Sequence, residues 1–364
     1  MSAVLHVVPG PEQHGVTRHA LDLLARNGLR EHSSQRLFTE GAPAADEAAS
    51  TLAQLPDADL LHLHLTDHLL APTAGECADL VAALMDRRPV SLTLHDLPQP
   101  ADGPGRYERR RGAYATMAAR ARGVVVASRH ERDLLLAALD AEGLSAPPIE
   151  IIPLPIEAPD APQATGLPDS SGPTDTARNL VVFGYLYPGK GHAAALEALA
   201  DLPVDVGLLA VGQVSDGHDD LVDELRTRAD ELGRRFTVTG FVDDAEIISV
   251  LQAAAVPVAP HRHISASGSI GSWLSAGRRP LVPAGGYVDE LAERAPGALL
   301  RYGPGLPHAD LAAAARAALA DPSLTWLGGD GSEPINVGPD GDAVAAHLAD
   351  VLDSWARDVN RATS

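Results

Sequence analysis

The chain has 364 residues, a hydrophobic content of 45% and a formal net charge of −21 at pH 7. The length favours two domains of ordinary size, and the hydrophobic content is sufficient for two cores. The strong negative charge argues against a general nucleic-acid-binding or anionic-membrane-binding surface, so any phosphate-binding site is expected to be local.

We expect a cytoplasmic protein without a transmembrane segment. The only cysteine, Cys77, excludes an internal disulfide and is typical of a reducing compartment. No apolar run reaches the ~20 residues that a bilayer span requires. Residues 1–9 have the pattern of a first strand and lack the charged start of a signal peptide.

Strand-like and helix-like segments alternate along the chain, which predicts an α/β protein with parallel sheets. In the first half, apolar strand segments lie at residues 4–8, 35–39, 60–65, 90–96, 123–128 and 149–154. In the second half, they lie at residues 180–186, 206–212, 236–242, 256–260, 279–284 and 298–302. Helical patterns fill the gaps, for instance at residues 17–28 and 130–143.

The amino-acid composition changes between the two halves. Residues 155–177 are rich in Pro, Asp, Ser, Thr and Gly without periodicity, which is typical of a linker, although a regulatory insert is an alternative. We therefore predict a first domain at residues 1–155, a linker at 156–178 and a second domain at 179–340. A final helix at residues 341–364 is free to cross back to the first half. Two such halves predict a cleft with ligands at the carboxyl ends of strands.

Asn179 to His192, NLVVFGYLYPGKGH, has the form of a buried strand that ends at Gly184 and leads through a loop into a helix. Of the 28 lysine and arginine residues, Lys190 is the only lysine. A compact ammonium suits phosphate or sugar oxygens, so we interpret Lys190 as a binding residue rather than a solvated surface cation.

Several segments, in this order, resemble the retaining glycosyltransferases of family 4, which have the GT-B fold. They are HGVTRHALDLL, TLHDLPQ, FGYLYPGKG, VTGFVDDAEI and SASGSIGSWLSAGRRPLV. The resemblance covers nearly the whole chain. It implies two Rossmann-like domains facing across a cleft, an acceptor held mainly by the first, a nucleotide-sugar donor held mainly by the second, and no metal or other cofactor.

In the first half, the loop that ends in His14-Gly15 enters a helix, where free N–H groups favour an anion, although a tight turn without a ligand is equally compatible. The family has a Gly-Gly pair here, so Gly15 is carried over as donor-binding. His95 ends a strand before Leu97-Pro98, and the resemblance implies that it contacts the transferring sugar. We predict His95 and Lys190 as the catalytic residues.

Three histidines and an aspartate in the first half invite a metal site. His62 and His64 alternate on one strand face, and His68 with Asp67 follows them. No partner outside this segment can be identified from the sequence. We therefore interpret the pair as packed or cleft-lining rather than as zinc ligands.

In the second half, the family has a strand ending in Gly-Arg followed by Lys-Gly, and the two cations bracket the donor diphosphate. Lys190 matches the family lysine and Gly184 the glycine, whereas Tyr185 stands in place of the arginine. Charge neutralisation at the departing phosphate is the largest catalytic contribution in such an enzyme, so this loss matters. Compensation by Arg262, Arg278 or Arg279 is one option.

Residues 265–272, SASGSIGS, open the next helix with four serines, more than a capped helix start requires. Small residues and free N–H groups predict a phosphate cradle, for which we select Ser267, Gly268, Ser269 and Ser272. The family usually carries two glutamates here, and their places fall on Ile264 and Ser272. Glu290, in another helix start, is a substitute ribose ligand or simply a first-turn glutamate. Gly240-Phe241 lies where the family reads the nucleotide base.

Residues 106–122 carry six arginines and form either a docking face for an anionic acceptor or a solvated helix face. Taken together, the sequence predicts a metal-independent retaining hexosyltransferase that uses a nucleotide diphosphate sugar and a soluble small-molecule or glycan acceptor. The alternatives are a sugar-nucleotide-binding protein without transfer activity and a GT-B-like sugar epimerase.

Overall fold

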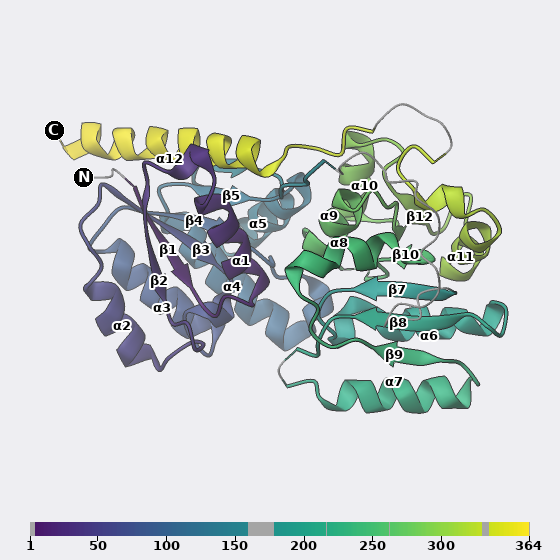
Figure 1. Ribbon diagram of the computed structural model, residues 1–364. Coiled ribbons are helices and arrows are strands. Elements are labelled where there is room, and N and C mark those ends of the chain that lie inside the picture. The colour runs from purple at the N-terminus through teal and green to yellow at the C-terminus, as the bar shows by residue number, and fades with distance from the viewer. Residues whose placement is uncertain (1–3, 159–177, 216, 262, 330–334, 364) are drawn as a thin grey trace. The chain divides into compact units, whose positions relative to one another are not determined.

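The computed structural model describes residues 4–158, 178–215, 217–261, 263–329 and 335–363 (Figure 1). The chain divides into two compact units, one formed by Met1–Pro155 with Pro339–Ser364 and the other by Ile156–Gly338. Each unit contains one six-stranded sheet whose strand pairs are all parallel. The predicted α/β class is therefore confirmed. The predicted linker falls largely on residues 159–177, which lie outside the described residues.

The sheet of the first unit has the strand order β2-β1-β3-β4-β5-β6. Its strands are β1 (Val4–Pro9), β2 (Ser33–Leu37), β3 (Leu60–Leu65), β4 (Val90–Leu94), β5 (Val124–Val126) and β6 (Ile149–Ile151). The four central strands are buried along their whole length, which explains why they are nearly continuous apolar segments in the sequence.

Helices cover both faces of this sheet. One face packs on α2 (Ala45–Ala53), α3 (Ala74–Met85), α4 (Pro104–Arg120) and α5 (Arg129–Ala141). The other face packs on α1 (Gly15–Leu24) and α12 (Gly341–Thr363). Short 3-10 helices lie at η1 (Asn27–Leu29), η2 (Asp67–Leu69) and η3 (Pro100–Asp102). The final helix α12 thus completes the core of the first unit, where it contacts η1, α1 and β3.

The sheet of the second unit has the order β12-β11-β10-β7-β8-β9. Its strands are β7 (Asn179–Phe183), β8 (Gly207–Val211), β9 (Phe236–Val238), β10 (Val256–Val258), β11 (Leu281–Pro283) and β12 (Leu300–Tyr302). One face packs on α6 (His192–Ala198), α7 (Asp220–Glu231) and α11 (Leu311–Ala320), and the other on α8 (Asp244–Gln252), α9 (Gly268–Ser275) and α10 (Gly286–Arg294). Further 3-10 helices are η4 (Pro188–Lys190), η5 (Leu199–Asp201) and η6 (Pro322–Thr325).

Serine and threonine caps fix where several helices begin. Thr73 and Ser128 each accept a hydrogen bond from the backbone N–H of the third residue of the helix that follows, α3 and α5 respectively. In α5 the Glu131 carboxylate also accepts a hydrogen bond from the backbone N–H of Ala127, the residue before the cap, at 2.7 Å. Among the described residues, no helix combines the length and the apolar character needed to cross a bilayer.

The packing of α12 yields a stability prediction. Leu352 on this helix is fully buried among the side chains of the first unit. Leu352→Ala is expected to lower the free energy of unfolding of the first unit by about 2–5 kcal/mol, because it leaves a cavity. Urea unfolding followed by circular dichroism measures this change. Asp350→Ala, on the exposed side of the same helix, is the control. Equal effects of the two substitutions would contradict the assignment of α12 to this core.

Candidate functional site

The second sheet contains a point where the strand order reverses. The chain builds β8 and β9 on one side of β7, and then returns to build β10 on its other side. In open α/β sheets, ligands bind outside the carboxyl ends of the strands at such a reversal. The segments that follow β7 and β10 are therefore the expected walls of a binding site. They contain Lys190 and the predicted serine-rich helix start, respectively.

Lys190 lies in η4, directly after the loop that leaves β7, and is 7% exposed. Its ammonium donates a hydrogen bond to Ser269 Oγ at 2.8 Å, so the two groups predicted to bind phosphate are in contact. Burial lowers the pKa of Lys190 to about 8. The ammonium is therefore poorly solvated. A second, anionic partner would stabilise its positive charge.

Gly184 makes room for this ammonium. Its φ of +112° is unfavourable for other residues, and a Cβ there would lie 3.0 Å from Lys190 Nζ. Gly191 follows Lys190 with φ +93°, and a Cβ there would lie 2.9 Å from the Pro260 backbone. Gly184 and Gly191 are thus required by close approach and by their positive φ, which the sequence pattern alone could not distinguish from an ordinary turn.

The serine-rich segment forms the beginning of α9. Ser267 caps the helix, because its Oγ accepts from the Ile270 N–H at 3.3 Å, and it lies 3.1 Å from Ser269 Oγ. Gly268 is exposed, and no heavy atom lies within 4 Å of the position its Cβ would occupy. Ser272 Oγ instead donates to the Gly268 carbonyl within the helix. The open backbone at Gly268 and the adjacent Lys190 give this helix start the properties of an anion-binding site.

Two histidines beside Lys190 were not predicted as site residues from the sequence. His261 Nε2 lies 3.2 Å from Ser267 Oγ, and His192 is the first residue of α6. Burial first, and Lys190 second, lower the pKa of both imidazoles, to about 3 for His192. Neither His192 nitrogen has a hydrogen-bond partner among the described atoms. Both rings therefore stay neutral at physiological pH and add no positive charge. Among the described residues of this cluster, Lys190 carries the positive charge.

The remaining predicted residues of the second unit follow neighbouring strands. Gly240 comes after β9 with φ +74°, and Phe241 is 58% exposed. Tyr185 follows β7, and its OH accepts a hydrogen bond from Gln213 Nε2 at 3.3 Å. Glu290 lies half-buried in α10, after β11. Each of these residues lies after the carboxyl end of a strand in the second sheet. The hydrogen bond from the Lys190 ammonium is accepted by Ser269.

Compensation for the missing family arginine by Arg278 was one option from the sequence. The structure does not support this option. Arg278 is 2% exposed, and its guanidinium donates to the carbonyls of Gln252 and Thr325 and to Thr325 Oγ1. The guanidinium also stacks on the Trp326 ring, 4.2 Å from its centroid. Arg278 therefore ties α9 to η6 and has no free face for a phosphate. Arg262 lies outside the described residues.

In the first unit, His95 and Gly15 follow carboxyl ends of the first sheet. Gly15 is the exposed first residue of α1, after the N-cap His14. The His95 ring packs edge-on against His19 of α1, with the centroids 5.6 Å apart. Burial lowers the pKa of His95 well below its usual value, and the neighbouring His19, His64 and His14 contribute. His95 Nε2 has no hydrogen-bond partner among the described atoms.

A buried arginine positions the loop that carries His95. Arg110 belongs to the arginine-rich segment of α4, but it is buried rather than solvated. It donates to both Asp67 carboxylate oxygens at 3.2 Å and to the Asp96 carboxylate at 2.8 Å. Its third carboxylate partner is Asp102, at 2.6 Å. Burial alone would raise the pKa of Asp67, but Arg110 more than offsets this and keeps it below the usual value.

The same network holds the backbone around His95. Tyr114 OH donates to the His95 carbonyl at 3.2 Å, and Arg110 donates to the Asp96 carbonyl at 2.8 Å. Asp96 adopts φ +52°, a conformation that costs energy for a residue other than glycine. Because Arg110 pairs with both the carbonyl and the side chain of Asp96, it stabilises this strained backbone directly after His95.

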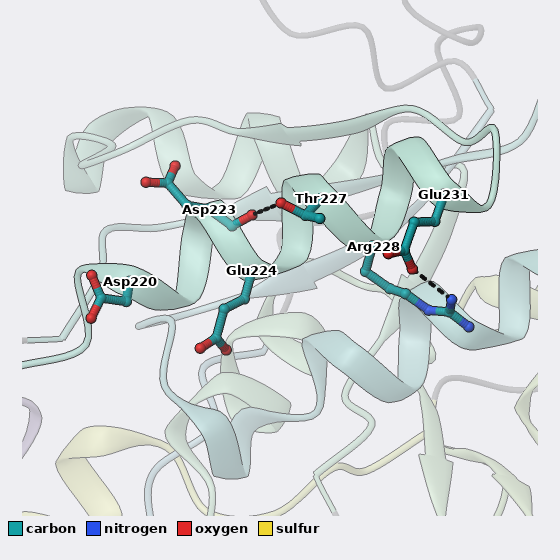
Figure 2. A pocket seen from close by; sticks show the side chains of 6 residues that line it. All are labelled: Asp220, Asp223, Glu224, Thr227, Arg228 and Glu231. Atoms are coloured by element: carbon teal, nitrogen blue, oxygen red, sulfur yellow. Dashed lines mark hydrogen bonds and ion pairs between the residues drawn. The ribbon is translucent and has the colours of Figure 1, made fainter.

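A shallow surface hollow on α7 is a poor candidate for the site. Figure 2 shows the six side chains that line it, all from one helix: Asp220, Asp223, Glu224, Thr227, Arg228 and Glu231. Arg228 is already paired with Glu231 at 2.9 Å, as the figure shows, and with Glu197. The remaining charges in the hollow are carboxylates, which repel phosphate. This surface lacks the convergent donors found around Lys190.

The sequence matches no family model and no curated protein. Solved structures do match over nearly the whole chain. HepE from Anabaena, in complex with UDP and glucose, aligns with a TM-score of 0.68 at 16% identity and covers 100% of this chain and 99% of its own. Sucrose-phosphate synthase from Thermosynechococcus elongatus aligns with a TM-score of 0.64 at 15% identity, covering 99% and 98%.

A third structure, apo OtsA, aligns with a TM-score of 0.59 at 12% identity and covers 99% of this chain and 97% of its own. The chain has the GT-B fold. The two sheets described above are thus the Rossmann-like domains of a GT-B protein, as the resemblance implied. At these identities, the likeness establishes the fold, whereas the cleft, the donor and the acceptor stay predictions.

The Arg110 network gives a prediction for the first GT-B domain. Arg110→Ala is expected to lower the free energy of unfolding of this domain by about 3–5 kcal/mol, because Asp67 would be left buried without a counter-charge. Chemical denaturation measures the change. The neighbouring exposed Arg109 provides the matched control, Arg109→Ala, with an expected change within about 0.5 kcal/mol. Similar small effects of both would show that Arg110 does not hold the loop.

Proposed function

We propose that this chain is a glycosyltransferase that moves a hexose from a nucleotide diphosphate sugar to a hydroxyl of a soluble acceptor. One observation carries the proposal: the Lys190 ammonium and the start of α9 converge at the strand-order reversal of a GT-B domain. Two of the similar structures contain UDP with glucose or UDP-glucose, so the fold accommodates such donors. A local cationic site also fits a chain whose net charge is −21.

In the proposed reaction, the donor diphosphate lies between Lys190 and the free N–H groups around Gly268. Lys190 neutralises the negative charge that develops as the diphosphate leaves, which is the electrostatic contribution expected to dominate. Ser269 Oγ accepts from Lys190 at 2.8 Å, so its own proton is free to reach Ser267 or a phosphate oxygen. Gly184, Tyr185, Gly240 and Phe241 line the donor site in this proposal.

Retention of the anomeric configuration is proposed to proceed with the leaving phosphate as the base for the acceptor hydroxyl. Such a route needs neither a metal ion nor a pair of catalytic carboxylates. His95 is proposed to contact the transferring sugar, and its neutral imidazole suits hydrogen bonding to hydroxyls rather than proton storage. A cytoplasmic setting is proposed from the composition, which includes one cysteine.

A second function, binding of a sugar nucleotide without transfer, is favoured by three departures from the family pattern. Tyr185 replaces the arginine, while Ile264 and Ser272 occupy the glutamate places. Arg278 is hydrogen-bonded to Thr325 and does not replace the family arginine in this proposal. A GT-B-like epimerase is a third option and would convert one sugar nucleotide into another of the same mass.

A panel of sugar nucleotides separates these functions. The protein is incubated with UDP-, GDP- and ADP-sugars and a mixture of hydroxyl acceptors, and mass spectrometry and chromatography detect free nucleotide, glycosylated product and epimerised donor. Transfer is expected for at least one donor. Tight binding of a donor without hydrolysis, transfer or epimerisation would overturn transfer and establish the binding protein.

Substitution of Lys190 tests its role. Lys190→Ala is expected to lower the rate of transfer by about 10²–10³-fold, the cost of removing one preorganised group that stabilises a transition-state charge. Lys190→Arg is not expected to restore the rate, because the planar guanidinium does not fit the narrow space beside Gly184. Arg226→Ala, at an exposed position on α7, is the charge-matched control. Unchanged activity in Lys190→Ala would mean that the site is misplaced.

The pKa of Lys190 predicts how binding depends on pH. In the free protein the ammonium loses its proton near pH 8, whereas a bound diphosphate keeps it charged. Binding above about pH 8 must therefore take up a proton, and the affinity for UDP is expected to fall by up to tenfold per pH unit. The terminal phosphate ionises near pH ~6 and does not interfere. Calorimetric titrations in buffers of different ionisation enthalpy measure this uptake, and Lys190→Ala is expected to abolish it. A flat affinity in the wild type would contradict the assignment.

A further inference from the structure

Three buried histidines share one face of the first sheet. His6 of β1 is the Cα partner of His62 in β3, and His64 lies two residues further along the same strand. Their exposures are 0%, 0% and 1%. One nitrogen from each ring can be chosen so that all three lie within 4.8 Å of one another. His62 and His64 stand near His68 and Asp67 in the sequence, but the residue that completes the group in the structure is His6.

His68 and Asp67 do not belong to this group. Asp67 is paired with the buried Arg110, and the His68 side chain is 54% exposed. His6 was not identifiable from the sequence because it lies 58 residues from His64, on another strand. Only the parallel pairing of β1 with β3 brings the three rings to the same place.

A chain of hydrogen bonds connects these rings to the surface. The Asp353 carboxylate on α12 lies 3.2 Å from His32 Nε2, and His32 Nδ1 lies 3.0 Å from His6 Nε2. His6 Nδ1 in turn lies 3.1 Å from His64 Nε2. A carboxylate can only accept a hydrogen bond. When all three rings are neutral, His32 therefore donates to Asp353, His6 donates to His32, and His64 donates to His6. This order leaves His64 Nδ1 as an acceptor, and it has no partner among the described atoms.

His64 borders a small cavity at the unpartnered end of this chain. The cavity has a volume of about 20 Å³, and its polar lining comes from His19, His64, Thr93 and His95. This volume suits about one water molecule, which needs at least two polar partners. The same sheet face is otherwise covered by apolar side chains of α1 and α12. Three imidazoles in such a core cost more to bury than aliphatic residues, so their presence calls for a compensating interaction.

We propose that His6, His62 and His64 bind one borderline transition-metal ion such as Zn²⁺. The 3.1 Å between His6 Nδ1 and His64 Nε2 is close to the ~3.3 Å edge of a tetrahedron with Zn–N bonds of ~2.0–2.1 Å. One His62 nitrogen exchanges its hydroxyl partner for the ion. The proton on His64 Nε2 moves to Nδ1, which has no hydrogen-bond partner among the described atoms, so no net proton is released. The three histidines leave the fourth tetrahedral position without a protein ligand from this group.

Outer partners for the ligands are already in place. His6 keeps its bond to His32, which is anchored by Asp353. His62 is bonded to Ser91 Oγ at 2.9 Å and Thr93 Oγ1 at 2.8 Å, and it keeps one of them. Such partners orient metal-bound histidines and tune their affinity. Three nitrogen ligands select Zn²⁺, Co²⁺, Ni²⁺ or Cu²⁺ over Mg²⁺ and Ca²⁺, which prefer oxygen.

This site is distinct from the Lys190 site and does not rest on the proposed function. It lies within the first unit, joins β1 to β3, and reaches α12 through His32 and Asp353. Its role is structural. A bound ion stabilises the folded first unit by mass action, because the unfolded chain does not hold the three rings together.

The test uses the full-length protein after treatment with a chelator and dialysis. Calorimetry with Zn²⁺ and the visible absorption of Co²⁺ measure binding, and elemental analysis gives the stoichiometry. The expected result is one ion per chain, tetrahedral Co²⁺ absorption, a raised melting temperature with Zn²⁺, and no response to Mg²⁺. Absence of stoichiometric Zn²⁺ and Co²⁺ binding by the wild type would overturn the proposal, whatever the variants do.

Substitutions locate the ion. His64→Gln is expected to weaken binding by more than about 100-fold, whereas His347→Gln, at an exposed position on α12, leaves it unchanged. Because a core variant can lose its fold, Asp353→Ala provides a milder test at a 44% exposed side chain. It is expected to weaken binding by about 10–100-fold, with Asp350→Ala as the matched control. An ion retained equally in His64→Gln and Asp353→Ala would be an adventitious surface ion and would overturn the site.

Discussion

The proposed donor site depends on a lysine ammonium held with little water in η4, after β7. Lys190 Nζ has Ser269 Oγ at 2.8 Å as its neutral partner, and burial lowers its pKa to about 8. A charge in such a place is costly unless an anion completes it. The surrounding structure serves this geometry: Gly184 leaves the space for the ammonium, and the start of α9 adds free N–H groups beside it. The strand-order reversal between β7 and β10 brings the two segments together.

The first unit uses the carboxyl end of its sheet differently. There, Arg110 compensates three carboxylates and holds the backbone after His95 in a strained conformation. Its stability thus depends on one buried ion-pair network, which is strongly destabilised when a partner is removed. On the α12 face of the same sheet, a chain of imidazoles replaces part of the apolar core. The second unit has apolar clusters on both faces of its sheet, and the buried cations among its described residues are Lys190 and Arg278.

Local patterns predicted much of this structure. Each predicted strand coincides with a strand of one of the two sheets, because buried parallel strands are short apolar runs bounded by turn residues. The contact between Lys190 and the serine-rich segment also followed from local signals, since both segments follow strands that meet at one sheet edge. The exact ends of the strands were harder to predict from the sequence. The fourth strand ends at Leu94, before His95, because Asp96 turns the chain with φ +52°.

Long-range partners could not be predicted in the same way. Nothing in a run of six arginines marks Arg110 as the buried one, since its aspartates are distributed over three separate segments. His6 is a single histidine in a first strand until β3 pairs with it. His261 meets Lys190 only when β10 lies beside β7. Arg278 has the charge expected of a phosphate ligand. However, it packs against Trp326, 48 residues away in the sequence, and this contact could not be predicted.

The most direct measurement is a crystal structure of the protein soaked with UDP. We expect diphosphate density between Lys190 Nζ and the backbone N–H groups at Gly268 and Ser269, with the Lys190–Ser269 hydrogen bond retained or replaced by phosphate contacts. Density for UDP elsewhere on the chain, with Lys190 still bonded only to Ser269, would contradict this expectation.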